Sequence, residues 1–298
     1  MTITSLKDIL KTFAQSLQVQ NSFPALVLVL INTLVVFPRL WPDVNWGVDN
    51  ETLTVTTIYV AIILSYTLYA FNIPLIRLVE GYWLNDRPWL KAFKEYLRER
   101  QIAEYKKLFT AIATDGEGRD AAQELGIRFP SKIDDVMATS LGNAIAAFED
   151  YPYTRYGMDA IALWPRLVPI LKKEDYLEFV TEQKSHFDFM LNMTIVLLVC
   201  GIELMYLIWY QSNFITLVFA MLFIPSVIWI FYLGTINSAI EWGTSVKVAF
   251  DLHRWGLWEA LHLKPVSRYK QEFNRWKKVS EFILDGSDSL NYNEVSYK

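Results

Sequence analysis

The sequence predicts an all-α polytopic membrane protein with four transmembrane helices in two hairpins, a large helical cytoplasmic insert between helices 2 and 3, and a helical cytoplasmic tail. Apolar and aromatic residues make up 53% of the 298 residues and charged residues only 20%, against about 45–50% and about 25% in ordinary soluble domains. Four runs of mostly uncharged residues are each long enough to span a bilayer, which takes about 20 residues in a helix. No convincing strand pattern occurs.

The four expected spans cover residues 23–40, 54–76, 189–210 and 214–240. Their orientation follows from the basic residues, because Lys and Arg collect in cytoplasmic loops. Of the 28 Lys and Arg residues, 27 lie in the two termini and the long loop, and only Arg39 lies in a short connection. We therefore expect a multi-pass protein of the plasma (inner) membrane with both termini in the cytoplasm.

The chain divides into five expected segments. These are an amphipathic interfacial helix at 1–22, a transmembrane hairpin at 23–84, a cytoplasmic helical insert at 85–187, a second transmembrane hairpin at 188–242 and a cytoplasmic helical tail at 243–298. The first segment has apolar residues at helical spacing, which predicts a helix that either lies on the inner leaflet or packs against the cytoplasmic part.

The long insert is too apolar and too long to be a linker. We expect helices at 87–113, 140–148 and 158–171, and a structured turn at 151–157. The apolar stripe of the first of these helices is expected to consist of Trp89, Leu90, Phe93, Leu97, Ile102, Tyr105 and Phe109. The tail should extend the fourth span to about residue 263 and then form one more helix at 266–284.

Several classes of function are disfavoured. A net charge of −4 gives no basic excess for binding nucleic acid. The single cysteine, Cys200, excludes a disulfide framework within the chain and a cysteine-based zinc site. Phosphate-binding loops, the HExxH motif and the GxSxG motif are absent from the sequence. We therefore expect no catalytic residue, no cofactor and no metal site, and the chain is not expected to be an enzyme.

Two groups of polar residues are candidate functional residues. Glu203 is the only ionisable residue well inside an expected span, and such residues usually face an ion path, a cavity or a partner. The candidates for a pore or ion path are Glu203, Asn32, Thr33, Ser65, Asn72 and Asn192. The alternative for the uncharged members is hydrogen bonding between helices. The candidates for a cytoplasmic mouth or pocket are Arg77, Glu80, Glu149, Arg155 and Arg166, for which a salt-bridged core is the alternative.

The layout is comparable to that of bestrophin-type anion channels and of large-pore channels with four spans, although no residue motif supports membership. The first hypothesis is an oligomeric ion channel or pore with a cytoplasmic helical vestibule. The alternative is a non-conducting membrane scaffold or accessory subunit that binds a protein partner through its cytoplasmic helices. A third, weaker alternative is a membrane-bound enzyme or a lipid-handling protein. The expected partners are the lipid bilayer, further copies of the chain and a cytoplasmic protein.

Overall fold

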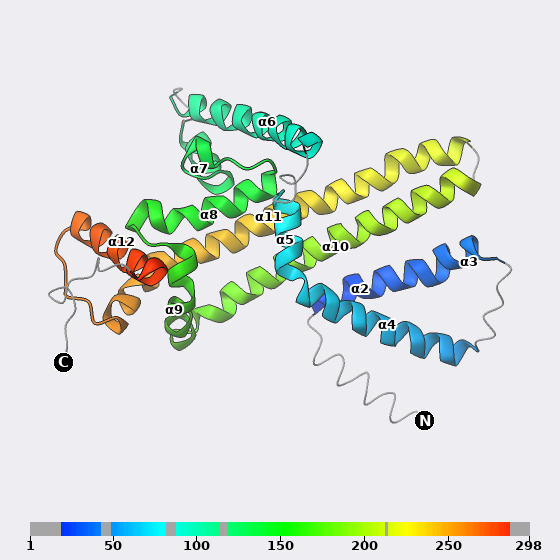
Figure 1. Ribbon diagram of the computed structural model, residues 1–298, viewed down its shortest axis with the longest axis horizontal. Coiled ribbons are helices and arrows are strands. Elements are labelled where there is room, and N and C mark those ends of the chain that lie inside the picture. The colour runs from blue at the N-terminus through cyan, green and yellow to red at the C-terminus, as the bar shows by residue number, and fades with distance from the viewer. Residues whose placement is uncertain (1–18, 43–48, 82–87, 114–117, 212–213, 287–298) are drawn as a thin grey trace. The chain divides into compact units, whose positions relative to one another are not determined.

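The computed structural model of the protein describes residues 19–42, 49–81, 88–113, 118–211 and 214–286. Helices account for most of these residues, and no strand occurs among them (Figure 1). The predicted all-α class is therefore confirmed. The interfacial helix expected at 1–22 lies almost entirely outside the described residues.

The helices follow one another along the chain as α2 (Val19–Ile31), the π-helix η1 (Asn32–Val36), α3 (Phe37–Leu40), α4 (Asn50–Ala70), α5 (Asn72–Glu80), α6 (Pro88–Ile112), α7 (Gly118–Arg128), the 3-10 helix η3 (Ile133–Asp135), α8 (Ser140–Tyr156), α9 (Ala160–Lys173), α10 (Tyr176–Gln211), α11 (Phe214–Ala260) and α12 (Tyr269–Asp285). Four stretches are long and apolar enough to cross a membrane, namely Val19–Leu40, Glu51–Ala70, Tyr176–Tyr210 and Phe214–Ala260. The sequence prediction of four such helices is therefore confirmed.

The chain folds into two compact units, which are described separately below. The membrane unit comprises the described residues up to Ile76 together with Ser185–Thr235. The helical unit comprises the described residues of Arg77–Lys184 and those from Ile236 onward. Helices α10 and α11 are each divided, with one part in the membrane unit and the other part in the helical unit.

The second span ends earlier than the sequence predicted. Asp49 caps α4 by accepting a hydrogen bond from the backbone N–H of Thr52 at 3.0 Å, as acidic residues commonly do at this position. The helix then ends at Ala70, and α5 begins at Asn72. Pro74 accounts for the break, because proline has no N–H to donate to the carbonyl of Ala70 and its ring crowds that carbonyl.

Small and polar residues mark the contacts between helices of the membrane unit. Helix α2 packs against α4. In α10 and α11, the hydroxyl groups of Thr194 and Thr235 are hydrogen-bonded at 2.9 Å. A Cβ atom at Gly201 would lie only 2.9 Å from a side-chain carbon of Ile224. Glycine at this point of α10 therefore allows α11 to approach closely, as small residues do between membrane helices.

The core of the helical unit forms where α8, α9 and α12 surround the second part of α11. The ring of Phe148 in α8 packs edge-on against Trp242 in α11, with ring centroids 4.9 Å apart. A Cβ atom at Gly243 would lie 2.4 Å from the Phe148 ring, so only glycine fits beside this contact. Trp276 of α12 and Phe250 of α11 are both fully buried.

The turn expected at 151–157 is not present. Helix α8 continues from Ser140 through Pro152 to Tyr156. Gly157 ends it with φ +76°, a left-handed conformation that glycine adopts at little cost. The tyrosines and Pro152 suggested a turn, but one missing N–H within a packed helix is tolerated when the helix buries an apolar face.

The apolar stripe predicted for α6 is only partly correct. Leu90 and Tyr105 are buried, and Leu97 and Ile102 pack beside them. The remaining members of that prediction, Trp89, Phe93 and Phe109, are exposed. The sequence could not distinguish the two sides because aromatic residues occur on both.

Candidate functional site

A stripe of three polar side chains runs along α10 in the membrane unit. Asp188, Asn192 and Glu203 occupy positions i, i+4 and i+15, which places them within about 60° of one another around the helix. Along the axis the first and the last are about 22 Å apart. We call these three residues the polar stripe.

Glu203 is the member of the stripe nearest the C-terminal end of α10. The side-chain amide of Asn32 donates a hydrogen bond to Oε2 of Glu203 at 3.0 Å and another to the carbonyl of Leu28 at 3.1 Å. Asn32 is the first residue of the π-helix η1, whose C-cap Phe37 donates its N–H to the Asn32 carbonyl. Single π turns in membrane and soluble helices are frequent at functional sites.

The middle of the stripe is Asn192, whose side chain is 0% exposed. Its amide nitrogen donates to Oδ1 of Asn21 at 2.9 Å and to the carbonyl of Gln20 at 3.1 Å. Its own carbonyl oxygen, Oδ1, is buried and finds no donor among the described residues. A buried carbonyl oxygen without a donor is costly, and such groups commonly bind water or an ion.

The other end of the stripe is Asp188, a buried acid that the sequence analysis did not select. Oδ1 of Asp188 accepts a hydrogen bond from the amide of Asn72, the first residue of α5, at 3.0 Å. Asp188 lies one residue before the expected third span. An acid at the end of a span is ordinarily expected to face water. Its spacing of four residues from Asn192 was the pattern that could have identified it.

Two of these contacts show how α2 lies against α10. The pair Asn21–Asn192 and the pair Asn32–Glu203 are each separated by 171 residues in the sequence. The two helices therefore run parallel and stay in register over about three turns. The rings of Phe23 and Phe189, with centroids 6.0 Å apart, lie at the same contact.

The structure thus brings four of the six ion-path candidates to the stripe, namely Glu203, Asn32, Asn72 and Asn192. The other two lie elsewhere. Thr33 is half-buried in η1, next to Asn32. Ser65 is buried in α4, and its hydroxyl has no hydrogen-bond partner among the described residues.

The mouth candidates all lie in the helical unit. Glu80, in α5, is buried. Burial and, after it, the charge of Glu149 raise the pKa of Glu80 from its usual 4.5 to about 7, against an opposing effect of Arg77. Burial and the charge of Asp159 raise the pKa of Glu149. The raised pKa values favour the neutral forms of both carboxyl groups, although only Glu80 is buried and Glu149 is exposed.

The two remaining mouth candidates make local contacts instead. Arg166 donates to the carbonyl of Ala162 on its own helix at 2.8 Å. The guanidinium of Arg155 lies 5.9 Å from the ring centroid of Tyr151. Neither of these two contacts involves Glu80 or Glu149.

A cluster around Asp251 was missed by the sequence analysis. The hydroxyl of Tyr156 donates to Oδ1 of Asp251 at 2.7 Å, and the hydroxyl of Tyr151 donates to Oδ2 at 3.0 Å. Burial and the charge of Asp251 raise the pKa of both tyrosines, which keeps them protonated as donors. The guanidinium of Arg254 lies 4.4 Å from the Tyr156 ring centroid and donates to Glu272 at 2.8 Å. These pairings satisfy one another and hold α8, α11 and α12 together.

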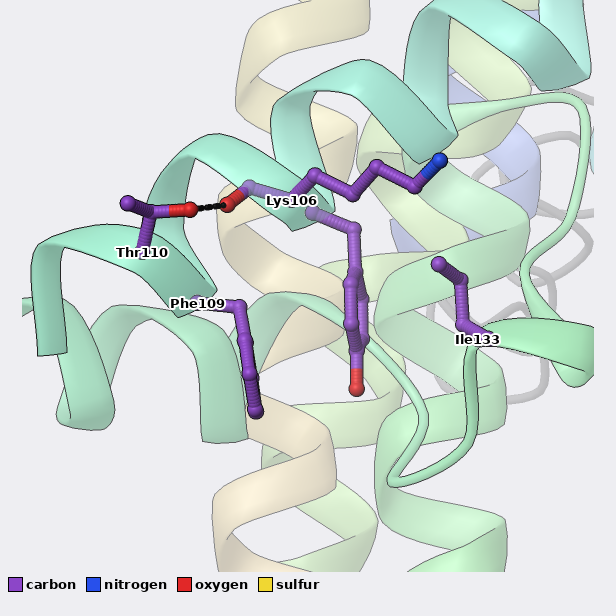
Figure 2. Close-up of a pocket in the computed structure, with 5 residues that line it drawn as sticks. Lys106, Phe109, Thr110 and Ile133 are labelled. Atoms are coloured by element: carbon purple, nitrogen blue, oxygen red, sulfur yellow. Dashed lines mark hydrogen bonds between the residues drawn. The ribbon is translucent and has the colours of Figure 1, made fainter. Parts of the chain in front are cut away.

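A shallow groove lies beside the end of α6, with a volume of about 370 Å³. It is lined by Tyr105, Lys106, Phe109, Thr110 and Ile133. Figure 2 shows the Thr110 hydroxyl turned to the Lys106 carbonyl, to which it donates at 2.8 Å. The lining therefore offers an apolar surface with one ammonium group and lacks an acid–base pair.

Among the described residues, no group of three His, Cys, Asp or Glu side chains is placed to hold a metal ion. No known protein family, curated protein or solved structure matches the chain. The candidate functional site is therefore identified from its geometry alone. It consists of the polar stripe of α10 and its three asparagine partners, Asn21, Asn32 and Asn72.

Proposed function

We propose that the protein is an oligomeric ion channel of the plasma (inner) membrane that conducts cations, with a cytoplasmic helical vestibule and no enzymatic activity. The observation that carries this proposal is the polar stripe, in which two carboxyl groups and one amide share a face of α10 over about 22 Å. That length is the larger part of the roughly 30 Å hydrocarbon core. Acids within spans usually mark ion paths, and rings of them select cations.

The proposal requires a homo-oligomer. In one chain the stripe contacts asparagine side chains of the same chain, and four spans with so few polar residues cannot enclose water. A path along α10 in several copies would place several Asp188 and Glu203 carboxyl groups around it. The free carbonyl oxygen of Asn192 would then be a ligand for a cation or its water.

The proposed topology has two membrane hairpins, with both termini and residues 85–187 on the cytoplasmic side. The parallel packing of α2 and α10 supports this arrangement, because both helices would then leave the cytoplasmic side and cross outward. The distribution of 27 of the 28 basic residues is the second support.

A reporter enzyme fused after Asn50 should be active outside the cell, whereas reporters fused at Gly118 or Lys298 should be active inside. The reason is the bias of basic residues toward one side of the membrane. The measurement is the paired activity of a reporter that works outside and one that works in the cytoplasm, at each position. An external Gly118 reporter would contradict the topology and, with it, the proposed vestibule.

Glu203→Gln should leave expression and oligomer size unchanged but alter ion selectivity. The substitution keeps the shape and an oxygen that can accept from Asn32, and it removes the carboxyl charge. Reversal potentials measured in planar bilayers under a salt gradient should shift toward zero as cation preference weakens. Particle mass in detergent should show three or more copies for both proteins.

The matched control is Glu51→Gln. This substitution removes an exposed acid in the first turn of α4, on the proposed external side, and leaves the three residues of the polar stripe unchanged. This variant should keep the wild-type reversal potential. The channel proposal fails for Glu203 if the wild type conducts and the Glu203→Gln variant has the same selectivity, conductance and pH response.

A non-conducting scaffold or accessory subunit that binds a cytoplasmic protein is the second candidate. It is favoured by one specific observation, the hydrogen bond between Glu203 and Asn32 within a single chain. Polar side chains paired in this way also stabilise membrane helices that conduct nothing. Absence of current at all voltages, a monomeric particle and tolerance of Glu203→Leu would together favour this candidate.

A further inference from the structure

In the described part of the chain, helix α6 packs against the rest of the helical unit through one side. Leu90 packs against Ala138, and Tyr105 packs against Phe129. Arg98, on the same side, donates to the carbonyl of Val136 at 2.9 Å. These contacts fix which side of α6 faces the core.

The other side exposes a row of aromatic residues. Trp89, Phe93 and Tyr96 are 66%, 50% and 57% exposed, respectively. Their spacing of i, i+4 and i+7 places them on one face of the helix. The same face continues to two exposed basic residues, Arg100 and Lys107, at i+11 and i+18. We call these five residues the α6 face.

We propose that the α6 face docks on the anionic headgroup layer of the membrane that holds the four spans, with its aromatic rings at the interface and its basic residues on lipid phosphates. Amphipathic helices that combine Trp or Phe with Lys and Arg bind membrane surfaces in this way. The proposal depends on the membrane location of the chain and not on ion conduction.

Charge supports a lipid occupant. Residues 88–112 carry six basic and three acidic side chains, whereas the whole chain has a net charge of −4. The anionic inner leaflet attracts such a segment, because each Lys or Arg near the surface strengthens binding. The composition of the row supports the same occupant, since Trp and Tyr are enriched at membrane–water interfaces.

Chain continuity provides the third argument. Trp89 follows Ala70, the last residue of a candidate span, by only 19 positions. The first turns of α6 are therefore tethered to the bilayer, which raises the effective concentration of the surface they would bind. Three large aromatic side chains left in water on one helical face would otherwise be an unusually apolar exposed patch.

The single cysteine makes a direct test possible. In a Cys200→Ser background, a nitroxide label is attached to the full chain at Phe93→Cys, on the α6 face. The control is Glu95→Cys, an exposed position about 160° away around the helix. Both proteins are reconstituted in phosphatidylcholine vesicles with and without phosphatidylglycerol, and the accessibility of each label to oxygen and to a water-soluble nickel chelate is measured.

With phosphatidylglycerol present, the label at 93 should be reached by oxygen and protected from nickel, while the label at 95 should be reached by nickel. The double substitution Arg100→Gln with Lys107→Gln should lower the ratio of docked to undocked label at 93 roughly thirtyfold. Equal nickel access at 93 and 95 would overturn the proposal. Protection of position 93 from both reagents in either lipid would also overturn it, because that result indicates contact with protein, either a second copy or a partner. Docking that is the same without phosphatidylglycerol would refute the role of anionic lipid.

Discussion

Replacing Trp276 by alanine should lower the free energy of unfolding of the helical unit by about 3–5 kcal/mol. Trp276 is 0% exposed, and its ring lies edge-on against Trp258 with centroids 5.2 Å apart. The substitution would leave a large cavity between α11 and α12. Trypsin cleavage at Lys277 and Lys278 measures the opening of α12 in the full chain, and its rate should rise by about a hundredfold or more when opening is fast.

Trp276→Phe is the matched variant. The indole nitrogen of Trp276 is buried and has no acceptor among the described residues, so phenylalanine keeps an aromatic ring and removes a donor without a partner. It should cost clearly less than alanine, because only part of the ring volume is lost. Wild-type cleavage rates in the alanine variant would show that α12 is not held by this residue.

The second large effect concerns Glu80 and pH. Because the pKa of Glu80 is raised from 4.5 to about 7, the folded state holds its proton where the unfolded state has lost it. Stability contributed by the neutral carboxyl group is therefore fully present below about pH 4.5 and is lost as the pH rises through 7. The loss is of the order of 3 kcal/mol across this window.

Glu80→Gln should remove most of this dependence, since glutamine stays neutral at every pH. Relative to wild type, the variant should be more stable at pH 8 than at pH 5, as measured by thermal unfolding of the solubilised chain at the two pH values. Glu99→Gln, at an exposed position of α6, is the control and should leave the pH profile unchanged. A Glu80→Gln profile that runs parallel to the wild-type profile would mean that this carboxyl group does not titrate with folding.

The four spans could be predicted from sequence because hydropathy and length are properties of a continuous segment. The early end of α4 shows the limit of that reasoning, since hydropathy continues past Ala70 while Pro74 interrupts the backbone hydrogen bonds. The exposed face of α6 shows a second limit. An aromatic residue has the same hydropathy whether it faces the protein core or the surface.

The polar stripe could be predicted only as a list of residues. Glu203 was selected as the ionisable residue well inside an expected span, and Asn32 was selected separately as a polar residue. Their hydrogen bond joins positions 171 apart, and that pairing depends on how the helices pack. Asp188 was missed for a similar reason, because its partner Asn72 is 116 residues away.

The π turn at Asn32–Val36 has a consequence for sequence variation. Such a turn holds one residue more than the α-helical turn it replaces, so the segment beyond it is out of phase with α2 by about 100°. Deletion of one residue between Thr33 and Val36 would bring the segment after the π turn back into helical phase with α2. It would rotate Phe37–Leu40 while Asn21 and Asn32 kept their places against α10. In this part of the chain the number of residues matters as much as their identity.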